Sequence, residues 1–103
     1  MASSKRYLEY VLDLLSELDD ISYRAMMGEY VLYYRGRVFG GIYDDRFLIK
    51  PTESARRILP DADVEIPYDG AKGMLLAKSE DRELIANMVE AMYDELPKPK
   101  KRS

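Results

Sequence analysis

Ile21-Ser-Tyr-Arg-Ala-Met-Met-Gly-Glu-Tyr-Val-Leu-Tyr-Tyr-Arg-Gly-Arg-Val-Phe-Gly-Gly-Ile-Tyr-Asp-Asp-Arg-Phe-Leu-Ile-Lys50 is the segment that carries the clearest structural pattern in this chain. It is rich in tyrosine and β-branched residues, which favour extended strands. Turn residues interrupt it at Gly28-Glu29, at Arg35-Gly36-Arg37 and at Asp44-Asp45. We therefore predict four strands, near residues 21–27, 30–35, 38–43 and 46–50. Connections this short force neighbouring strands to run antiparallel, as a meander.

The alternation of side chains in this segment predicts a sheet with one apolar face. In the second strand, Tyr30, Leu32 and Tyr34 fall on one side, because successive side chains of a strand point to opposite faces. The other side carries a mixture of apolar and polar residues. Gly40-Gly41 lies inside the third strand, where a glycine pair marks a bulge or a close approach of two backbones.

The flanking segments supply the helices that can cover the apolar face. Apolar residues recur every three or four positions near both ends of the chain, which indicates amphipathic helices. Thr52 and Ser79 are the expected N-caps of the two later helices. Outside the meander we predict a helix over 4–18, a short helix to about residue 59, weak strands at 64–66 and 74–77, and a final helix over 79–96.

This order of elements predicts an α+β fold, a two-layer sandwich in which an antiparallel β-meander packs against the N- and C-terminal helices. The chain has 103 residues, a common length for one domain. We therefore expect one domain over residues 1–97. The basic segment 98–103, which follows Pro97, is expected to be a disordered tail.

Composition excludes several classes of function. The chain contains no cysteine and no histidine, so disulfides, thiolate zinc sites and histidine acid–base chemistry are excluded. No segment resembles a signal peptide or a membrane span, so we expect a soluble, cytoplasmic protein without a membrane partner. The net charge is −3, but residues 21–60 carry +3 and residues 61–97 carry −7. A local basic patch on the sheet is therefore compatible with the sequence.

The tyrosines and methionines each have two interpretations. Five of the nine tyrosines lie between Tyr23 and Tyr43, where they either form an interaction surface or serve as strand formers at the margin of the core. The methionines either fill gaps in the core, which is the more frequent situation, or form an adaptable partner surface. The four methionines concerned are Met26, Met27, Met88 and Met92.

Two short motifs resemble sites but are better explained as turns. The carboxylates of Asp44 and Asp45 are adjacent in sequence, and we interpret the pair as a hairpin turn. Gly70-Ala71-Lys72-Gly73 lacks the spacing and the Ser or Thr of a phosphate-binding loop. We therefore predict no catalytic residue, no metal site and no cofactor.

The segment 21–50 resembles the core of the TfoX (Sxy) family N-terminal domain. The family pattern combines Tyr-Arg-x-Met-x-Gly with later tyrosines, a glycine turn, a Val-Phe strand and a strand ending in Lys. The residues at these places are Arg24, Met27, Gly28, Tyr30, Tyr33, Gly36, Phe39 and Lys50. The segment Pro67-Tyr-Asp-Gly-Ala-Lys72 is also similar, so the resemblance covers nearly all of residues 4–96.

Two departures from the family pattern stand out. The family often shows Phe-Gly-Gly-Tyr-Gly where this chain has Met27-Gly28-Glu29-Tyr30-Val31, which predicts a more regular second strand. The chain also ends where full-length regulators continue into a C-terminal helical domain, so we expect a stand-alone N-terminal module. The resemblance implies a fold similar to the secretion-chaperone-like sandwiches, which are often homodimers. It also implies a role in natural competence, beside a DNA-binding transcription factor, and brings no catalytic residues.

Three hypotheses about function follow. The first is a protein-interaction module that regulates transcription or competence through a protein partner. The Tyr- and Arg-rich sheet motivates this hypothesis. Its candidate surface consists of Arg24, Met27, Tyr30, Tyr33, Arg35, Arg37 and Lys50. The alternative is direct nucleic-acid binding through these basic residues, Arg56, Arg57 and the tail. The third is an enzyme or small-ligand binder, which would need a buried pocket with an acidic residue beside Lys50 or Arg24.

Overall fold

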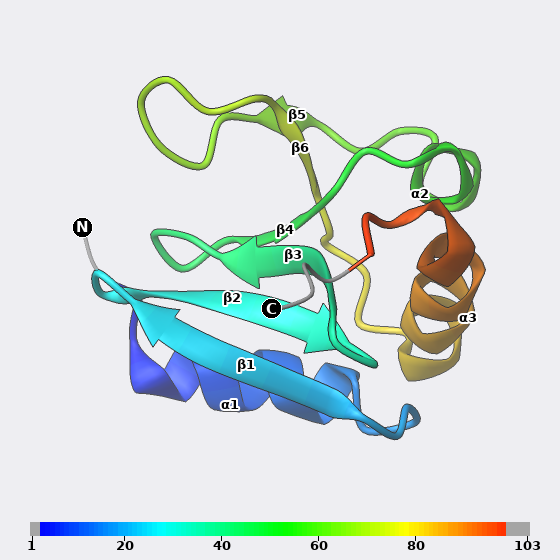
Figure 1. Ribbon diagram of the computed structural model, residues 1–103, viewed down its shortest axis with the longest axis horizontal. Coiled ribbons are helices and arrows are strands. Elements are labelled where there is room, and N and C mark those ends of the chain that lie inside the picture. The colour runs from blue at the N-terminus through cyan, green and yellow to red at the C-terminus, as the bar shows by residue number, and fades with distance from the viewer. Residues whose placement is uncertain (1–2, 99–103) are drawn as a thin grey trace, which may run out of the picture.

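The computed structural model describes residues 3–98 and, over that range, consists of one antiparallel sheet and three α-helices. The helices are α1 (Lys5–Leu14), α2 (Glu53–Ile58) and α3 (Arg82–Met92), and a 3₁₀ helix, η1 (Tyr93–Glu95), follows α3. The strands are β1 (Ile21–Met26), β2 (Glu29–Tyr34), β3 (Arg37–Ile42), β4 (Phe47–Ile49), β5 (Val64–Glu65) and β6 (Met74–Leu76). Their order in the sheet is β1-β2-β3-β4-β6-β5 (Figure 1). The predicted α+β fold is confirmed.

The predicted tail lies almost entirely outside the described residues, which end at Lys98. Within the described part of the chain, no helix combines the length and the apolar character needed to cross a bilayer.

The meander from β1 to β4 is built on two-residue turns. The turn residues, with their φ angles, are Met27 (+53°) and Gly28 (+84°), Arg35 (+50°) and Gly36 (+81°), and Asp44 (+53°) and Asp45 (+55°). Positive φ at both central positions is the type I′ geometry, whose twist matches that of the flanking strands. The first turn is therefore Met27-Gly28 and not the predicted Gly28-Glu29, because Glu29 already pairs with Met26 across the hairpin.

Of the two alternatives predicted for the glycine pair of β3, the structure shows a close backbone approach at Gly40 and a bulge just before the pair. The register between β2 and β3 shifts after Leu32, and Phe39 is the extra residue that forms the bulge. A Cβ atom on Gly40 would lie 2.3 Å from the carbonyl oxygen of Leu48. Strands β3 and β4 can therefore pair at this point because position 40 carries no side chain.

The helices cover one face of the sheet, which we call the helix face. Figure 1 shows α1 running along β1 and β2, while α2 and α3 lie next to each other at one side of the sheet. Met88 and Met92 of α3 are fully buried in this core, as the core interpretation predicted, whereas Met26 and Met27 are exposed and the same interpretation is wrong for them. The buried sheet residues of the helix face are Leu32, Tyr34, Phe39, Ile42, Phe47, Ile49 and Leu75.

The helix boundaries depend on side-chain caps. Thr52 caps α2 as predicted, because its hydroxyl accepts a hydrogen bond from the Ala55 amide at 3.1 Å. The prediction for Ser79 is wrong, since Asp81 caps α3 by accepting hydrogen bonds from the amides of Glu83 and Leu84. The Ser79 hydroxyl instead accepts a hydrogen bond from the Asp81 amide. It therefore orients the residue that forms the cap.

The carboxylate of Glu95 joins the end of α3 to the start of α2. It accepts hydrogen bonds from the hydroxyl of Ser54 and, at 2.9 Å, from the Ser54 amide. Ser54 is buried, so this carboxylate satisfies polar groups that have lost contact with water. These two hydrogen bonds hold the pKa of Glu95 below its usual value, and the bond from the hydroxyl has the larger effect.

We expect this contact to weaken in acid. The folded-state pKa of Glu95 is lowered, so its stabilisation is present above the pKa of an unfolded glutamate, about 4.3, and is lost as the pH falls through the folded-state pKa. Unfolding by urea at a series of pH values, together with NMR titration of the Glu95 side chain, measures this loss. Glu95→Gln should flatten that part of the profile, and a profile identical to that of the wild type would contradict the prediction.

Candidate functional site

The face of the sheet that points away from the helices, which we call the open face, carries several of the candidate residues. Cross-strand pairing places Arg24 opposite Val31, Val31 opposite Gly41, and Gly41 opposite Leu48. Paired residues of neighbouring strands share a face. Val31 and Leu48 are buried although they lie outside the core packed by the helices. Something other than a helix must therefore cover this part of the open face.

The cover is the loop between β5 and β6, residues 66–73. Its Pro67 is buried and, with Tyr68, lines one groove together with Val31 of β2 and another together with Val38 of β3. The aromatic rings of Tyr68 and Tyr43 pack with their centroids 6.0 Å apart. The loop thus divides the open face into two grooves that share this aromatic pair.

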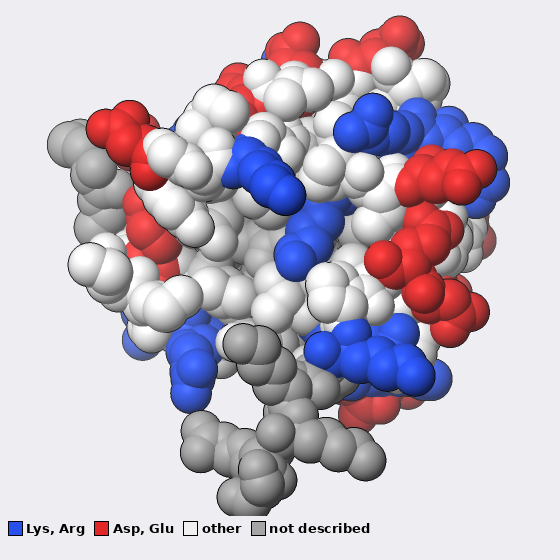
Figure 2. All heavy atoms as spheres, turned by 45° about the horizontal axis from the view of Figure 1, so that its top comes forward, with Lys and Arg blue, Asp and Glu red and all other residues white. Residues whose placement is uncertain are grey.

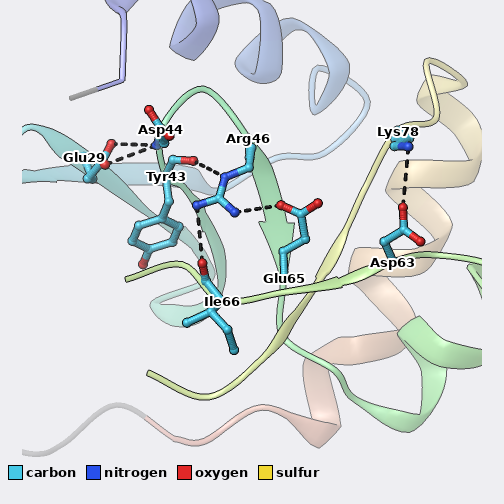
Figure 3. A network of polar contacts seen from close by, with 8 residues as sticks. All are labelled: Glu29, Tyr43, Asp44, Arg46, Asp63, Glu65, Ile66 and Lys78. Atoms are coloured by element: carbon cyan, nitrogen blue, oxygen red, sulfur yellow. Dashed lines mark hydrogen bonds and ion pairs between the residues drawn. The ribbon is translucent and has the colours of Figure 1, made fainter. Parts of the chain in front are cut away.

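Arg46 holds the start of this loop in place (Figure 3). Its guanidinium group donates hydrogen bonds to the carbonyl oxygen of Tyr43 at 3.0 Å and to the Glu65 carboxylate at 2.7 Å. A third, longer hydrogen bond reaches the carbonyl oxygen of Ile66 at 3.4 Å. The arginine is mostly buried, so the pair with Glu65 is less screened than a surface ion pair. It therefore fixes β5 and the loop relative to the turn that follows β3.

Glu29 acts on the same turn between β3 and β4 and ties it to the turn between β1 and β2. Its carboxylate accepts hydrogen bonds from the Asp44 amide at 3.1 Å (Figure 3) and from the Ser3 amide at 3.0 Å. Ser3 is buried, and its hydroxyl also accepts a hydrogen bond from the Asp45 amide. These contacts hold the β1–β2 turn beside the β3–β4 turn. Asp44 and Asp45 thus form a hairpin turn, as interpreted from the sequence.

The larger groove, which we call the methionine groove, lies between the β1–β2 turn and the loop. Its volume is about 630 Å³, and its surface is mostly apolar. Met27, at the tip of the turn, is 97% exposed, and Met26 and Tyr68 are exposed by half or more. Apolar groups gathered in this way are typical of a binding surface. The groove is lined by Met26, Met27, Glu29, Val31, Tyr43, Pro67 and Tyr68.

The second groove, which we call the lysine groove, lies on the other side of the aromatic pair. Its volume is about 430 Å³, and two lysines, Lys50 and Lys72, line it beside Val38, Met74 and the backbone of Gly40. Its lining contains no acidic residue. The enzyme or small-ligand hypothesis requires an acidic residue in a pocket beside Lys50. This groove does not contain that arrangement. The described residues also contain no cluster of three potential metal ligands.

Tyr43 separates the two grooves and is half-buried there. Burial raises the pKa of its hydroxyl, and the neighbouring Tyr68 and Glu29 raise it further. The side chain therefore stays neutral across the physiological range. A Cβ atom on Gly41 would lie 2.6 Å from the Tyr43 ring, so this glycine makes room for the ring on the open face.

The structure places the seven candidate residues on three parts of the molecule. Arg24, Tyr33 and Lys50 occupy open-face positions, and Met27 lies at the rim of the methionine groove. Tyr30 lies on the helix face, where it packs partly against the core and meets the Tyr23 ring edge-on at 5.8 Å. Arg35 and Arg37 belong to a different cluster.

Arg35 and Arg37 pack against tyrosines at the end of α3, in what we call the Arg–Tyr cluster. Arg37 pairs with Tyr34 across the hairpin and so shares the helix face. Its guanidinium carbon lies 4.1 Å from the centre of the Tyr93 ring, and its Nη1 donates a hydrogen bond to the Tyr93 carbonyl at 2.8 Å. Arg35 lies 5.4 Å from the Tyr34 ring and 5.8 Å from the Tyr93 ring. Arg37 therefore joins β3 to the C-terminal end of α3.

Sequence reasoning missed the residues that the loop brings to the open face. Tyr43, Pro67, Tyr68 and Lys72 line the grooves, yet they were not in the candidate set. An exposed tyrosine after a proline in a loop is a weak signal for such a contact. The position of the loop depends on Arg46 and Glu65, whose pairing is visible in the folded chain alone.

Comparison with known proteins agrees with the resemblance in the sequence. The family model described as TfoX N-terminal domain matches residues 13–94. A protein from Spirochaeta aurantia, called "Uncharacterized 12.7 kDa protein in trpE 5'region", is 31% identical over 104 residues, which cover 99% of this chain and 90% of that protein. No solved structure matches the chain. The expected similarity to secretion chaperones therefore stays a prediction.

Proposed function

The chain belongs to the TfoX N-terminal domain family, and on that basis we propose that it is a non-enzymatic protein-interaction module. We further propose that it regulates transcription, in the setting of natural competence, by contacting a protein partner through the open face. The methionine groove is the centre of that contact.

The exposure and the backbone conformation of Met27 carry this proposal. The residue is 97% exposed and has a φ of +53°. A left-handed backbone costs a residue with a side chain about 1–2 kcal/mol, and exposure leaves the thioether without packing partners inside the fold. Glycine or asparagine would suit this turn better. The hairpin needs positive φ at this position but does not need methionine there, and contact of the side chain with a partner accounts for an unfavourable residue in this turn.

The grooves also define the chemistry of the partner. The methionine groove suits an apolar side chain, because flexible methionines adapt to different shapes. Lys50 and Lys72 lie on the far side of the Tyr43–Tyr68 pair and suit an acidic residue. We therefore propose a partner segment with an apolar anchor beside an acidic side chain.

Direct nucleic-acid binding is the competing proposal, and the charge distribution favours it less. Arg35 and Arg37 pack against Tyr34 and Tyr93 and do not share the open face with Arg24. On the face drawn in Figure 2, basic side chains are separated by uncharged surface and have acidic side chains around them. A nucleic-acid interface requires phosphate contacts along a continuous basic surface.

The Met27→Asn variant tests the proposed function. We expect it to fold at least as stably as the wild type, because asparagine tolerates the left-handed turn. Its affinity for a partner captured from nuclease-treated bacterial lysate and then purified should fall by about tenfold or more, as expected for a residue at the centre of an interface. Isothermal calorimetry measures the affinity, and urea unfolding measures the stability.

Val64→Asn is the matched control, because Val64 is an exposed apolar residue outside both grooves. It should leave the affinity unchanged. Equal affinities of the Met27→Asn variant and the wild type would contradict the proposal, as would repeated failure to capture any specific partner. Binding to DNA that weakens steeply with added salt would instead favour the nucleic-acid alternative.

A further inference from the structure

The two edges of the sheet differ in length and exposure. The edge strand β5 has two residues and is followed closely by Pro67, so it offers little to an incoming strand. The other edge strand, β1, has six residues and no proline, and five of the six are exposed. In Figure 1, β1 has β2 as its neighbour on one side and no strand on the other.

The pairing of β1 with β2 determines which backbone groups of β1 point outward. Met26 and Glu29 flank a two-residue turn and form the first pair of the hairpin, and such a pair exchanges hydrogen bonds. In an antiparallel ladder every second residue bonds to the neighbouring strand. The hydrogen bond from the Arg35 amide to the Asp20 carbonyl belongs to the same series. The amides and carbonyls of Ile21, Tyr23 and Ala25 therefore point away from β2.

A row of outward amides and carbonyls is complementary to another extended strand. We infer that β1 pairs antiparallel with β1 of a second copy of this chain, so that two sheets join edge to edge into one. This inference concerns the edge of the sheet and does not depend on the proposed function of the open face.

The sequence of β1 is complementary to itself in one register. With a two-fold axis at Tyr23, the two Tyr23 residues face each other, and Ile21 lies opposite Ala25 of the second copy. Arg24 then lies opposite Ser22, so the two guanidinium groups are not directly opposed. The register that centres on Arg24 would place like charges face to face, which is unfavourable. Self-pairing at Tyr23 also brings two half-exposed aromatic rings together.

The two-fold axis of such a pair is perpendicular to the sheet, so both open faces lie on the same side. The interface is formed mainly by one strand from each copy and is smaller than a standard protein interface. We therefore expect a reversible dimer that is populated at about 100 µM and dissociates at about 1 µM, as is typical of small interfaces. Sedimentation equilibrium over this range measures the association.

Ala25→Pro is the decisive variant. Proline removes an amide hydrogen that points outward and leaves the bonds between β1 and β2 intact, as tolerated on edge strands. This variant should remain monomeric at the highest concentration, whereas the control Ala25→Ser, which keeps the amide, should still dimerise. Met27→Asn should also dimerise, because Met27 lies outside the paired strands. Circular dichroism verifies that each variant is folded.

Hydrogen exchange in the unchanged protein provides a second, independent readout. The amides of Ile21, Tyr23 and Ala25 should exchange at least tenfold more slowly at high protein concentration than at low concentration, since pairing protects them. A chain that is monomeric throughout, a dimer that Ala25→Pro leaves intact, or exchange at these three amides that is independent of concentration would each overturn the inference.

Discussion

Gly40→Ala is expected to destabilise the fold strongly. The added Cβ atom would lie 2.3 Å from the Leu48 carbonyl oxygen and 3.2 Å from the Ile49 Cα. Both are backbone atoms of β4, so no side-chain rotation can relieve the clash, and β3 and β4 must separate. Overpacking of this severity costs about 3 kcal/mol or more, a large part of the roughly 5–15 kcal/mol that stabilises a domain of this size. Urea unfolding followed by circular dichroism measures the loss.

Gly70→Ala is the matched control, because it makes the same chemical change in an open position. No atom lies within 4 Å of the added Cβ, but the φ of Gly70 is +85°, where alanine is strained. We expect a loss of about 1 kcal/mol and a cooperative transition. If both alanine variants were equally stable, the close approach of β3 and β4 would not be the reason for glycine at position 40.

Arg37→Ala is expected to have the second largest effect on stability. The variant loses a hydrogen bond from a charged donor to the Tyr93 carbonyl and the stacking of the guanidinium group on the Tyr93 ring. Together these contacts are worth about 2–3 kcal/mol when partly buried. The β3 end of the sheet and the end of α3 should separate first. Thermal and urea unfolding measure the loss of stability.

Arg24→Ala serves as the control for Arg37→Ala. Both arginines lie on strands of the meander, but Arg24 is exposed on the open face and has no ion pair or hydrogen bond among the described contacts. Its replacement should change stability by less than about 0.5 kcal/mol. Similar losses in the two variants would show that Arg37 is not a structural brace. The pair thus separates arginines that stabilise the fold from those available to a partner.

Local sequence was sufficient to predict the meander, because each hairpin depends on residues close in the chain. The turns at Arg35-Gly36 and Asp44-Asp45 contain residues that accept positive φ, and the alternation around Leu32 fixed which side faces the core. Thr52 was a predictable cap for the same reason, since its hydrogen bond to Ala55 spans three residues.

The sequence could not predict features that depend on distant contacts. Ser79 and Asp81 are both good caps, and the packing of α3 decides between them. The loop over the open face depends on Arg46 meeting Glu65, nineteen residues later. The side on which Arg37 lies was predictable in principle, because it faces Tyr34 directly across a two-residue turn. Treating Arg35 and Arg37 as one surface with Arg24 ignored that pairing.

The division of the core between the two ends of the chain has a consequence for biosynthesis. The meander ends at Ile49, so it leaves the ribosome before α3, and its hairpins form within about 10 µs of emerging. Its helix face is apolar and includes Phe39, Phe47 and Ile49. At that stage α1 covers this face in part, but α3, which is translated last, does not yet cover the rest. During that interval the nascent chain is vulnerable to aggregation. Chaperones that bind apolar surface at the ribosome should therefore raise the yield of folded protein.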